Sequence, residues 1–129
     1  MKKLLTMIAV ILALTGAIVW EEITIQNYIG EIKQKTEYII EISTGLDNIQ
    51  TDEISMCVDD LKKTWIHHEK VLSMFSNHKD IRDLCIEIQK LEANIQVNQY
   101  EDFSAGLKVI SHLADDYLSL MGTTWQNIF

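Results

Sequence analysis

Four successive stretches of the chain place apolar side chains three and four residues apart, and this spacing constrains the fold more than any other feature. A helix with 3.6 residues per turn collects such positions on one face. The chain has no proline and only five glycines, so little in it interrupts a long helix. We therefore predict an all-α fold. The four stripes are Ile25, Tyr28, Ile29, Ile32, Thr36, Ile39, Ile40 and Ser43; Ile54, Val58, Leu61, Trp65, His68, Leu72 and Phe75; Ile81, Leu84, Ile88, Leu91, Ile95 and Asn98; and Phe103, Leu107, Ile110, Ala114, Tyr117 and Met121.

Short connections between these stretches indicate how the helices pack. Gly45 offers a stop after the first stretch, Thr51 a helix N-cap before the second, and Ser76-Asn77 a break before the third. Helices joined by connections of about 3–7 residues pack most simply as antiparallel neighbours, which predicts an up-down bundle of four helices. The first stripe contains Thr36 and Ser43 and is less apolar than the others. A bundle of three helices on a helical stalk therefore stays open as the alternative.

The N-terminus has the pattern of a membrane anchor. Lys2 and Lys3 precede an uncharged apolar run from Leu4 to Trp20. As a helix this run rises about 25 Å, close to the ~30 Å hydrocarbon core of a bilayer and longer than the apolar part of a cleavable signal peptide. We interpret residues 1–21 as an uncleaved signal-anchor and residues 22–129 as the bundle domain, with the first bundle helix continuing the anchor. Cleavage at Thr15-Gly16-Ala17 is the alternative.

Charge predicts the side of the membrane and the class of partner. Lys2 and Lys3 favour a cytoplasmic N-terminus, which places the domain outside the cell membrane in a single-pass topology. The residues after Trp20 include 19 acidic and 9 basic side chains, a formal charge of −10. This charge repels the phosphates of nucleic acids. We therefore expect no nucleic-acid binding, membrane lipid around the N-terminal helix, and a protein partner or a second copy as the binding partner.

Three histidines, His67, His68 and His78, suggest a metal site at first sight. His67 and His68 are adjacent and point about 100° apart on a helix, and neither has a ligand four residues further on. His78 lies ten residues beyond His68, too far to share its metal. We predict that His68 is a partly buried histidine with a hydrogen bond across the bundle, that His67 is solvated, and that His78 shapes a turn. No metal or cofactor is expected. The fourth histidine, His112, lies in the fourth helical stretch and does not change this expectation.

The two cysteines predict neither a disulfide nor a nucleophile. In a hairpin that turns near Asn77, Cys57 and Cys85 differ in height by roughly 18 Å, whereas a bridge allows a Cα separation of at most ~7 Å. We expect two free and mostly buried thiols. Neither has a histidine at a helical spacing, and the chain has no nucleophile elbow and no phosphate loop. We therefore expect no enzyme activity and no catalytic residues.

The two ends of the chain are predicted to meet at the membrane. If the fourth helix descends beside the first, it returns the terminal WQNIF to the height of Trp20. Tryptophan is favoured at membrane interfaces, so Trp20 and Trp125 could both lie in the headgroup region. Packing of Trp125 under the core is the alternative.

Several short motifs occur in a characteristic order: the MKKLL start, Lys62-Lys63-Thr64-Trp65, the turn from His78 to Ile81, and the final Gln126-Asn127-Ile128-Phe129. In this order they resemble a family of small, membrane-anchored, all-helical proteins of spore-forming Gram-positive bacteria that is classified as a domain of unknown function. The basic residue expected within the third helix is present only as Lys90. The resemblance implies an extracytoplasmic helical domain without an assigned activity.

We therefore expect a membrane-anchored, extracytoplasmic interaction or structural module. The alternative is a ligand-binding sensory bundle, which would need a partner membrane protein for its signal because the cytoplasmic segment has only a few residues.

Overall fold

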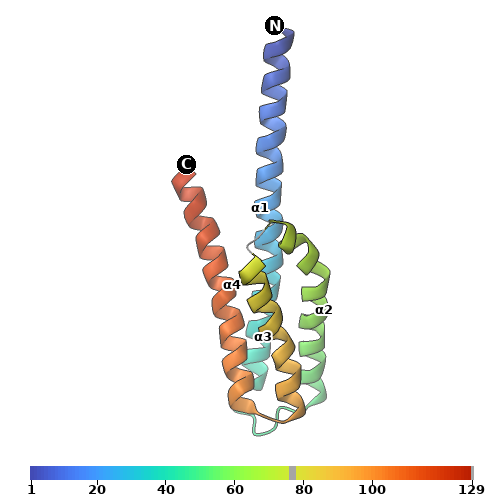
Figure 1. The fold of residues 1–129 in the computed structure, drawn as a ribbon. Coiled ribbons are helices and arrows are strands. Elements are labelled where there is room, and N and C mark those ends of the chain that lie inside the picture. Colours follow the sequence, from blue (N-terminus) through green and yellow to red (C-terminus); the bar gives the residue numbers. More distant parts are fainter. Residues whose placement is uncertain (76–77, 129) are drawn as a thin grey trace.

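Four helices make up the computed structural model, which describes residues 1–75 and 78–128; the side chains of Phe75, His78 and residues 120–128 lie outside the description. The helices are α1 (Lys2–Ser43), α2 (Asp52–Phe75), α3 (His78–Gln96) and α4 (Tyr100–Ile128). The described ranges contain no strand. Figure 1 shows α2, α3 and the lower parts of α1 and α4 as a bundle, from which the N-terminal half of α1 projects. The all-α prediction is confirmed.

Each helix packs against two neighbours. α1 contacts α2 and α4, and α3 contacts the same two helices, which is the arrangement of an up-down bundle. The first stripe is buried in this bundle, and its polar members Thr36 and Ser43 are buried with it. The Thr36 hydroxyl donates to the carbonyl of Ile32, so its burial leaves no unpaired donor. The bundle therefore has four helices, and the alternative of three helices on a stalk is wrong.

The core consists mainly of predicted stripe positions, and it also contains Ile49 of the loop between α1 and α2, which the stripes did not include. Trp65 and Phe103 are its large aromatic members, and most of its other members are Ile and Leu. Gly106 of α4 faces α3, and a Cβ there would lie 3.4 Å from Leu91 Cδ2. Tyr28, Ile40 and Tyr117 are partly buried and pack at the edge of the core. Phe75 and Met121, also predicted in the stripes, have side chains outside the described residues.

The loops at the end of the bundle far from the N-terminus follow the sequence signals in all but one place. Gly45 has a φ of +81°, the left-handed conformation that ends a helix, and the Thr51 hydroxyl accepts a hydrogen bond from the Ile54 amide at 3.3 Å. The prediction that Asn98 continues the third stripe is wrong. Asn98 lies beyond α3, is exposed, and has a φ of +52°. Its side-chain oxygen accepts from the Ile49 amide at 3.0 Å and so ties the two loops together.

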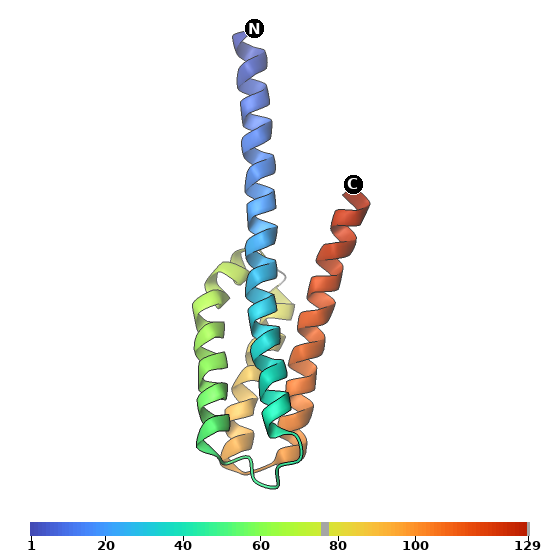
Figure 2. The same cartoon turned by 180° about the vertical axis from the view of Figure 1, so that it is seen from behind.

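α1 runs without a break from the apolar segment into the bundle, as predicted. Its first 17 residues are exposed, and this is the one described helix that is long and apolar enough to cross a membrane. Seen from both sides, α1 continues well beyond the end of α2 and the start of α3 (Figures 1 and 2). α4 also extends past the end of α2, and it diverges from α1 as it does so (Figure 2). The bundle and the apolar segment are therefore joined by continuous helix.

Candidate functional site

A polar cluster interrupts the packing between α1 and α2. His68 of α2 is 7% exposed, and its Nε2 lies 2.8 Å from Oε2 of Glu31 on α1. The predicted hydrogen bond from His68 across the bundle is thus confirmed. The heptad spacing of α2 places His68 in the buried stripe, between Trp65 and Leu72. Burial of a polar ring without a hydrogen-bond partner would be costly there.

The His68 ring is held on two further sides. It stacks on Tyr28 with ring centroids 3.7 Å apart and an interplanar angle of 14°, and the neighbouring His67 ring is tilted against it at 5.0 Å. Its Nδ1 is buried and has no hydrogen-bond partner in the described part of the chain. We assign the proton to Nε2, which donates to the Glu31 carboxylate, because a proton on Nδ1 would be buried without an acceptor.

Lys35 extends the cluster by one helical turn. Its Nζ donates to the Thr64 hydroxyl at 2.6 Å and lies 2.9 Å from Asp60 Oδ2 and 3.5 Å from Glu31 Oε1. Partial burial acts to lower the pKa of Lys35, but the hydrogen bond and charge of Asp60, with those of Glu31, outweigh it and raise that pKa. Lys35 therefore stays protonated and links α1 to two side chains of α2.

Glu31 lies between His68 and Lys35 and is charged at neutral pH. The hydrogen bond from His68 lowers the pKa of the Glu31 carboxyl, and desolvation opposes this. The charge of Lys35, with that of the His68 ring when the ring is protonated, adds to the lowering. Each member of the cluster is thus paired with another member. Such a network fixes the register of two helices.

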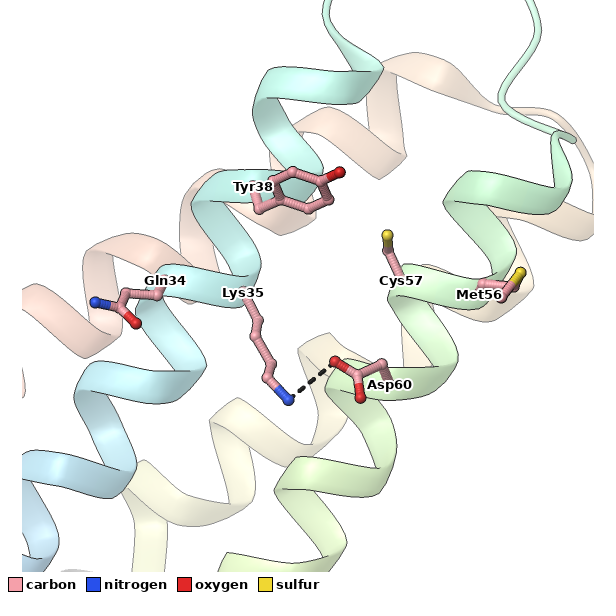
Figure 3. Close-up of a pocket in the computed structure, with 6 residues that line it drawn as sticks. All are labelled: Gln34, Lys35, Tyr38, Met56, Cys57 and Asp60. Atoms are coloured by element: carbon pink, nitrogen blue, oxygen red, sulfur yellow. Dashed lines mark ion pairs between the residues drawn. The ribbon is translucent and has the colours of Figure 1, made fainter.

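A groove next to the cluster, also between α1 and α2, has a volume of about 500 Å³. It is lined by Gln34, Lys35, Tyr38, Met56, Cys57 and Asp60. Figure 3 shows Tyr38 and Cys57 facing the space between the helices, with the ion pair of Lys35 and Asp60 at one end. The volume falls within the range of small-molecule sites, and the walls are largely apolar.

The groove has one potential nucleophile, the Cys57 thiol. Burial raises the pKa of this thiol, and the carboxylates of Glu53 and Asp60 raise it further. A thiol in such surroundings is less reactive than an ordinary cysteine, since the thiolate is the nucleophile. Cys57 and Cys85 are both free, and each is partly buried rather than mostly buried as predicted.

The other histidines stay apart from the cluster or at its edge. His67 is exposed, as predicted. His112 is exposed and pairs loosely with Asp116, 3.7 Å away on the next turn of α4. α3 begins at His78, whose side chain lies outside the described residues. Among the residues that the structure describes, no three His, Cys, Asp or Glu side chains come together as metal ligands would.

Reading the sequence alone picked out His68 but missed the partners that define the cluster. Glu31 and Lys35 are spaced four apart on the flank of the first stripe, and Asp60 and Thr64 have the same spacing beside the second. Such pairs are common on solvated helix faces, so the spacing alone does not reveal that the two flanks meet. Only the packing of α1 against α2 brings them together.

Comparison with known proteins gives one match. Residues 19–128 match the family described as "Domain of unknown function (DUF4363)". No curated protein and no solved structure matches the chain. The matched range contains the whole bundle and only the last residues of the apolar segment.

Proposed function

The chain belongs to the DUF4363 family, a domain of unknown function, and we propose that it is a single-pass membrane protein whose helical bundle acts outside the cell membrane as an interaction or structural module. In this proposal residues 1–21 are the anchor and residues 22–129 the working domain. We also infer that the family is the one the sequence resembles, with anchored members in spore-forming Gram-positive bacteria.

The continuous helix α1 is the observation that supports the proposal most strongly. Its N-terminal segment is apolar and exposed, and no other part of the described chain covers it. Exposed apolar surface on this scale is unfavourable in water, whereas a bilayer solvates it and leaves every helical hydrogen bond intact. Because the helix continues into the core of the bundle, the anchor would hold the domain at a fixed height above the membrane.

Charge supports the proposed orientation and the kind of contact. Lys2 and Lys3 precede the apolar segment and Glu21 and Glu22 follow it, which favours a cytoplasmic N-terminus. The domain of residues 22–129 has a formal charge of −9, so nucleic acid is not proposed as a partner. A basic or neutral protein surface, or an uncharged face of a second copy, fits this charge better.

A non-catalytic role is proposed because the titratable groups between α1 and α2 are engaged with one another. Glu31 and Lys35 share partners, and the surroundings of Cys57 raise the pKa of its thiol. These features suit a rigid scaffold.

Crosslinking in the membrane followed by mass spectrometry tests the proposal. The exposed amines of Lys63, Lys70 and Lys108 offer reactive positions on α2 and α4. We expect the full chain to fractionate with membranes and to form crosslinks from these lysines to another membrane or surface protein, or to a second copy. The matched control is residues 22–129 without the anchor, which should lose membrane-dependent crosslinks. Recovery of the full chain only from the soluble fraction, or crosslinks confined to one chain, would contradict the proposal.

The groove between α1 and α2 favours one second candidate, a sensory bundle that binds a small ligand. The groove is formed partly by α1, so a ligand there would contact the same helix that enters the membrane. A signal would then need a partner with a cytoplasmic output domain. Such a partner among the crosslinked proteins supports this candidate, and partners that all lack one argue against it.

A further inference from the structure

We propose that the end of α4, residues 122–128, is a second membrane contact that lies in the headgroup region beside α1. We call this segment the α4 tail. The proposal goes beyond the function proposed above and rests on its anchor, since α1 sets the height of the membrane relative to the bundle.

An ion pair fixes the register of α4 against α1. Lys33 of α1 pairs with Asp115 of α4. Thirteen residues lead from Asp115 to Ile128, and thirteen lead from Lys33 to Trp20. Because the two helices are antiparallel and rise equally per residue, both segments climb about 20 Å. The end of α4 therefore reaches approximately the level of Trp20, the residue that closes the apolar segment.

The other two helices stop short of this level. His68 of α2 lies beside Glu31, seven residues from the end of α2 at Phe75. Seven residues from Glu31 toward the N-terminus is Thr24, which lies about 6 Å below Trp20 along the helix. α2 ends at this lower level, and α4 continues past the end of α2 and the start of α3 (Figures 1 and 2). The α4 tail thus leaves the bundle and has neither α2 nor α3 beside it.

The sequence of α4 changes at the same place. Five charged residues lie between Tyr100 and Asp116, and none follows from Tyr117 to Ile128. The tail itself, GTTWQNI, combines hydroxyls, amides and one tryptophan. This composition is too polar for the hydrocarbon core, and it suits the interface, where tryptophan is enriched and polar groups are hydrated.

A lipid surface fits the tail better than a second copy does. The anchor places a bilayer at the level of Trp20 at all times, so contact with it requires no further association. A second copy would bring another domain with a formal charge of −9 against the first. α4 also diverges from α1 toward its C-terminal end, so the α4 tail is set apart from the anchor helix (Figure 2).

Quenching of tryptophan emission by bromine in the lipid tests the proposal on the full chain. The protein is reconstituted in phosphatidylcholine vesicles that have bromine near the headgroup end of the acyl chains, and in matched vesicles without bromine. Trp65, 2% exposed in the core, is kept in every variant so that the fold is preserved and emission of the folded domain is monitored. One variant keeps Trp65 alone (Trp20→Phe with Trp125→Phe), one also keeps Trp125 (Trp20→Phe), and one also keeps Trp20 (Trp125→Phe).

We expect the emission of Trp65 alone to be the same in both vesicles. The additional emission from Trp125 should be lost in brominated vesicles to an extent comparable to that from Trp20. If bromine removes the contribution of Trp20 and spares that of Trp125, the membrane contact of the α4 tail is refuted while the anchor stands. If bromine spares both, the anchor is refuted and the tail contact with it.

Discussion

The hydrogen bond between His68 and Glu31 should couple α1 to α2 by a measurable amount that depends on pH. The perturbation is a double-mutant cycle with His68→Phe and Glu31→Ala. Phenylalanine keeps an aromatic ring against Tyr28 and removes the hydrogen-bonding nitrogens, and alanine removes the carboxylate. The cycle isolates the pair because neither replacement creates a new hydrogen bond.

The expected magnitude follows from the exposure of the two side chains. A hydrogen bond to a charged group contributes about 1.5–3 kcal/mol when shielded from water. The His68 side chain is 9% exposed but that of Glu31 is 43% exposed, so water screens part of the interaction. We expect a coupling of about 1 kcal/mol at pH 7.

The pH dependence comes from the carboxylate. Because the pKa of Glu31 is lowered from 4.5 in the folded state, its contribution is fully present above pH 4.5 and is lost as the pH falls through the folded-state pKa. Coupling should therefore be present at neutral pH and disappear once Glu31 is protonated.

Urea unfolding of the full chain in detergent micelles measures the coupling. Emission of Trp65, three residues from His68, reports the transition in a background of Trp20→Phe and Trp125→Phe. The exposed pair of Lys63 and Asp59, spaced four apart on α2, is the matched control and should couple by no more than about 0.5 kcal/mol. A coupling between His68 and Glu31 below about 0.3 kcal/mol at neutral pH, or one equal at neutral and acid pH, would refute the reasoning.

Three further predictions concern the loops, the glycines and the groove. In urea unfolding, Asn98→Ala should destabilise the domain by about 2 kcal/mol and Asn98→Gly by about 1 kcal/mol. Both variants lose the hydrogen bond to the Ile49 amide, but only alanine is strained at positive φ. Equal losses of stability would contradict this explanation. Gly30→Ala places a methyl group in open space on a helix and should stabilise the domain by about 0.5–1 kcal/mol. Gly45→Ala, at a φ of +81°, should destabilise it by about 1 kcal/mol. Effects of the same sign would be evidence against this difference in backbone conformation. Cys57 should react with iodoacetamide at pH 8 more slowly than an unstructured peptide thiol, since its pKa is raised, and faster alkylation would rule this out.

Most of the fold was predictable because the helices have clear local signals in the sequence. The buried stripe from Ile54 to Leu72 follows a heptad with few exceptions, and the cap at Thr51 and the stop at Gly45 are local signals read over a few residues. Asn98 misled the prediction because its spacing continues the third stripe. Asparagine tolerates the left-handed conformation, and this preference outweighs the spacing at a helix end.

Two questions left open by the sequence needed the packing. The burial of Thr36 and Ser43 shows that the bundle has four helices. This burial is tolerated because both hydroxyls donate hydrogen bonds to carbonyls of their own helix. Composition alone does not reveal these hydrogen bonds. The partners of His68 could not be predicted from the sequence either. Glu31 is 37 residues away in the chain, and only the register of α1 against α2 identifies it.

The topology of the chain is the most direct test of the central proposal. The bundle loop at Asp47 is exposed, so a single cysteine there (Asp47→Cys with Cys57→Ser and Cys85→Ser) can be labelled in intact cells with a maleimide that does not cross the membrane. The matched control places the cysteine at Lys3, on the other side of the apolar segment. The proposal predicts that the full chain fractionates with membranes, that position 47 is labelled in intact cells, and that position 3 is labelled only after lysis. Labelling of position 3 but not of position 47 in intact cells, or a chain found only in the soluble fraction, would contradict the proposal.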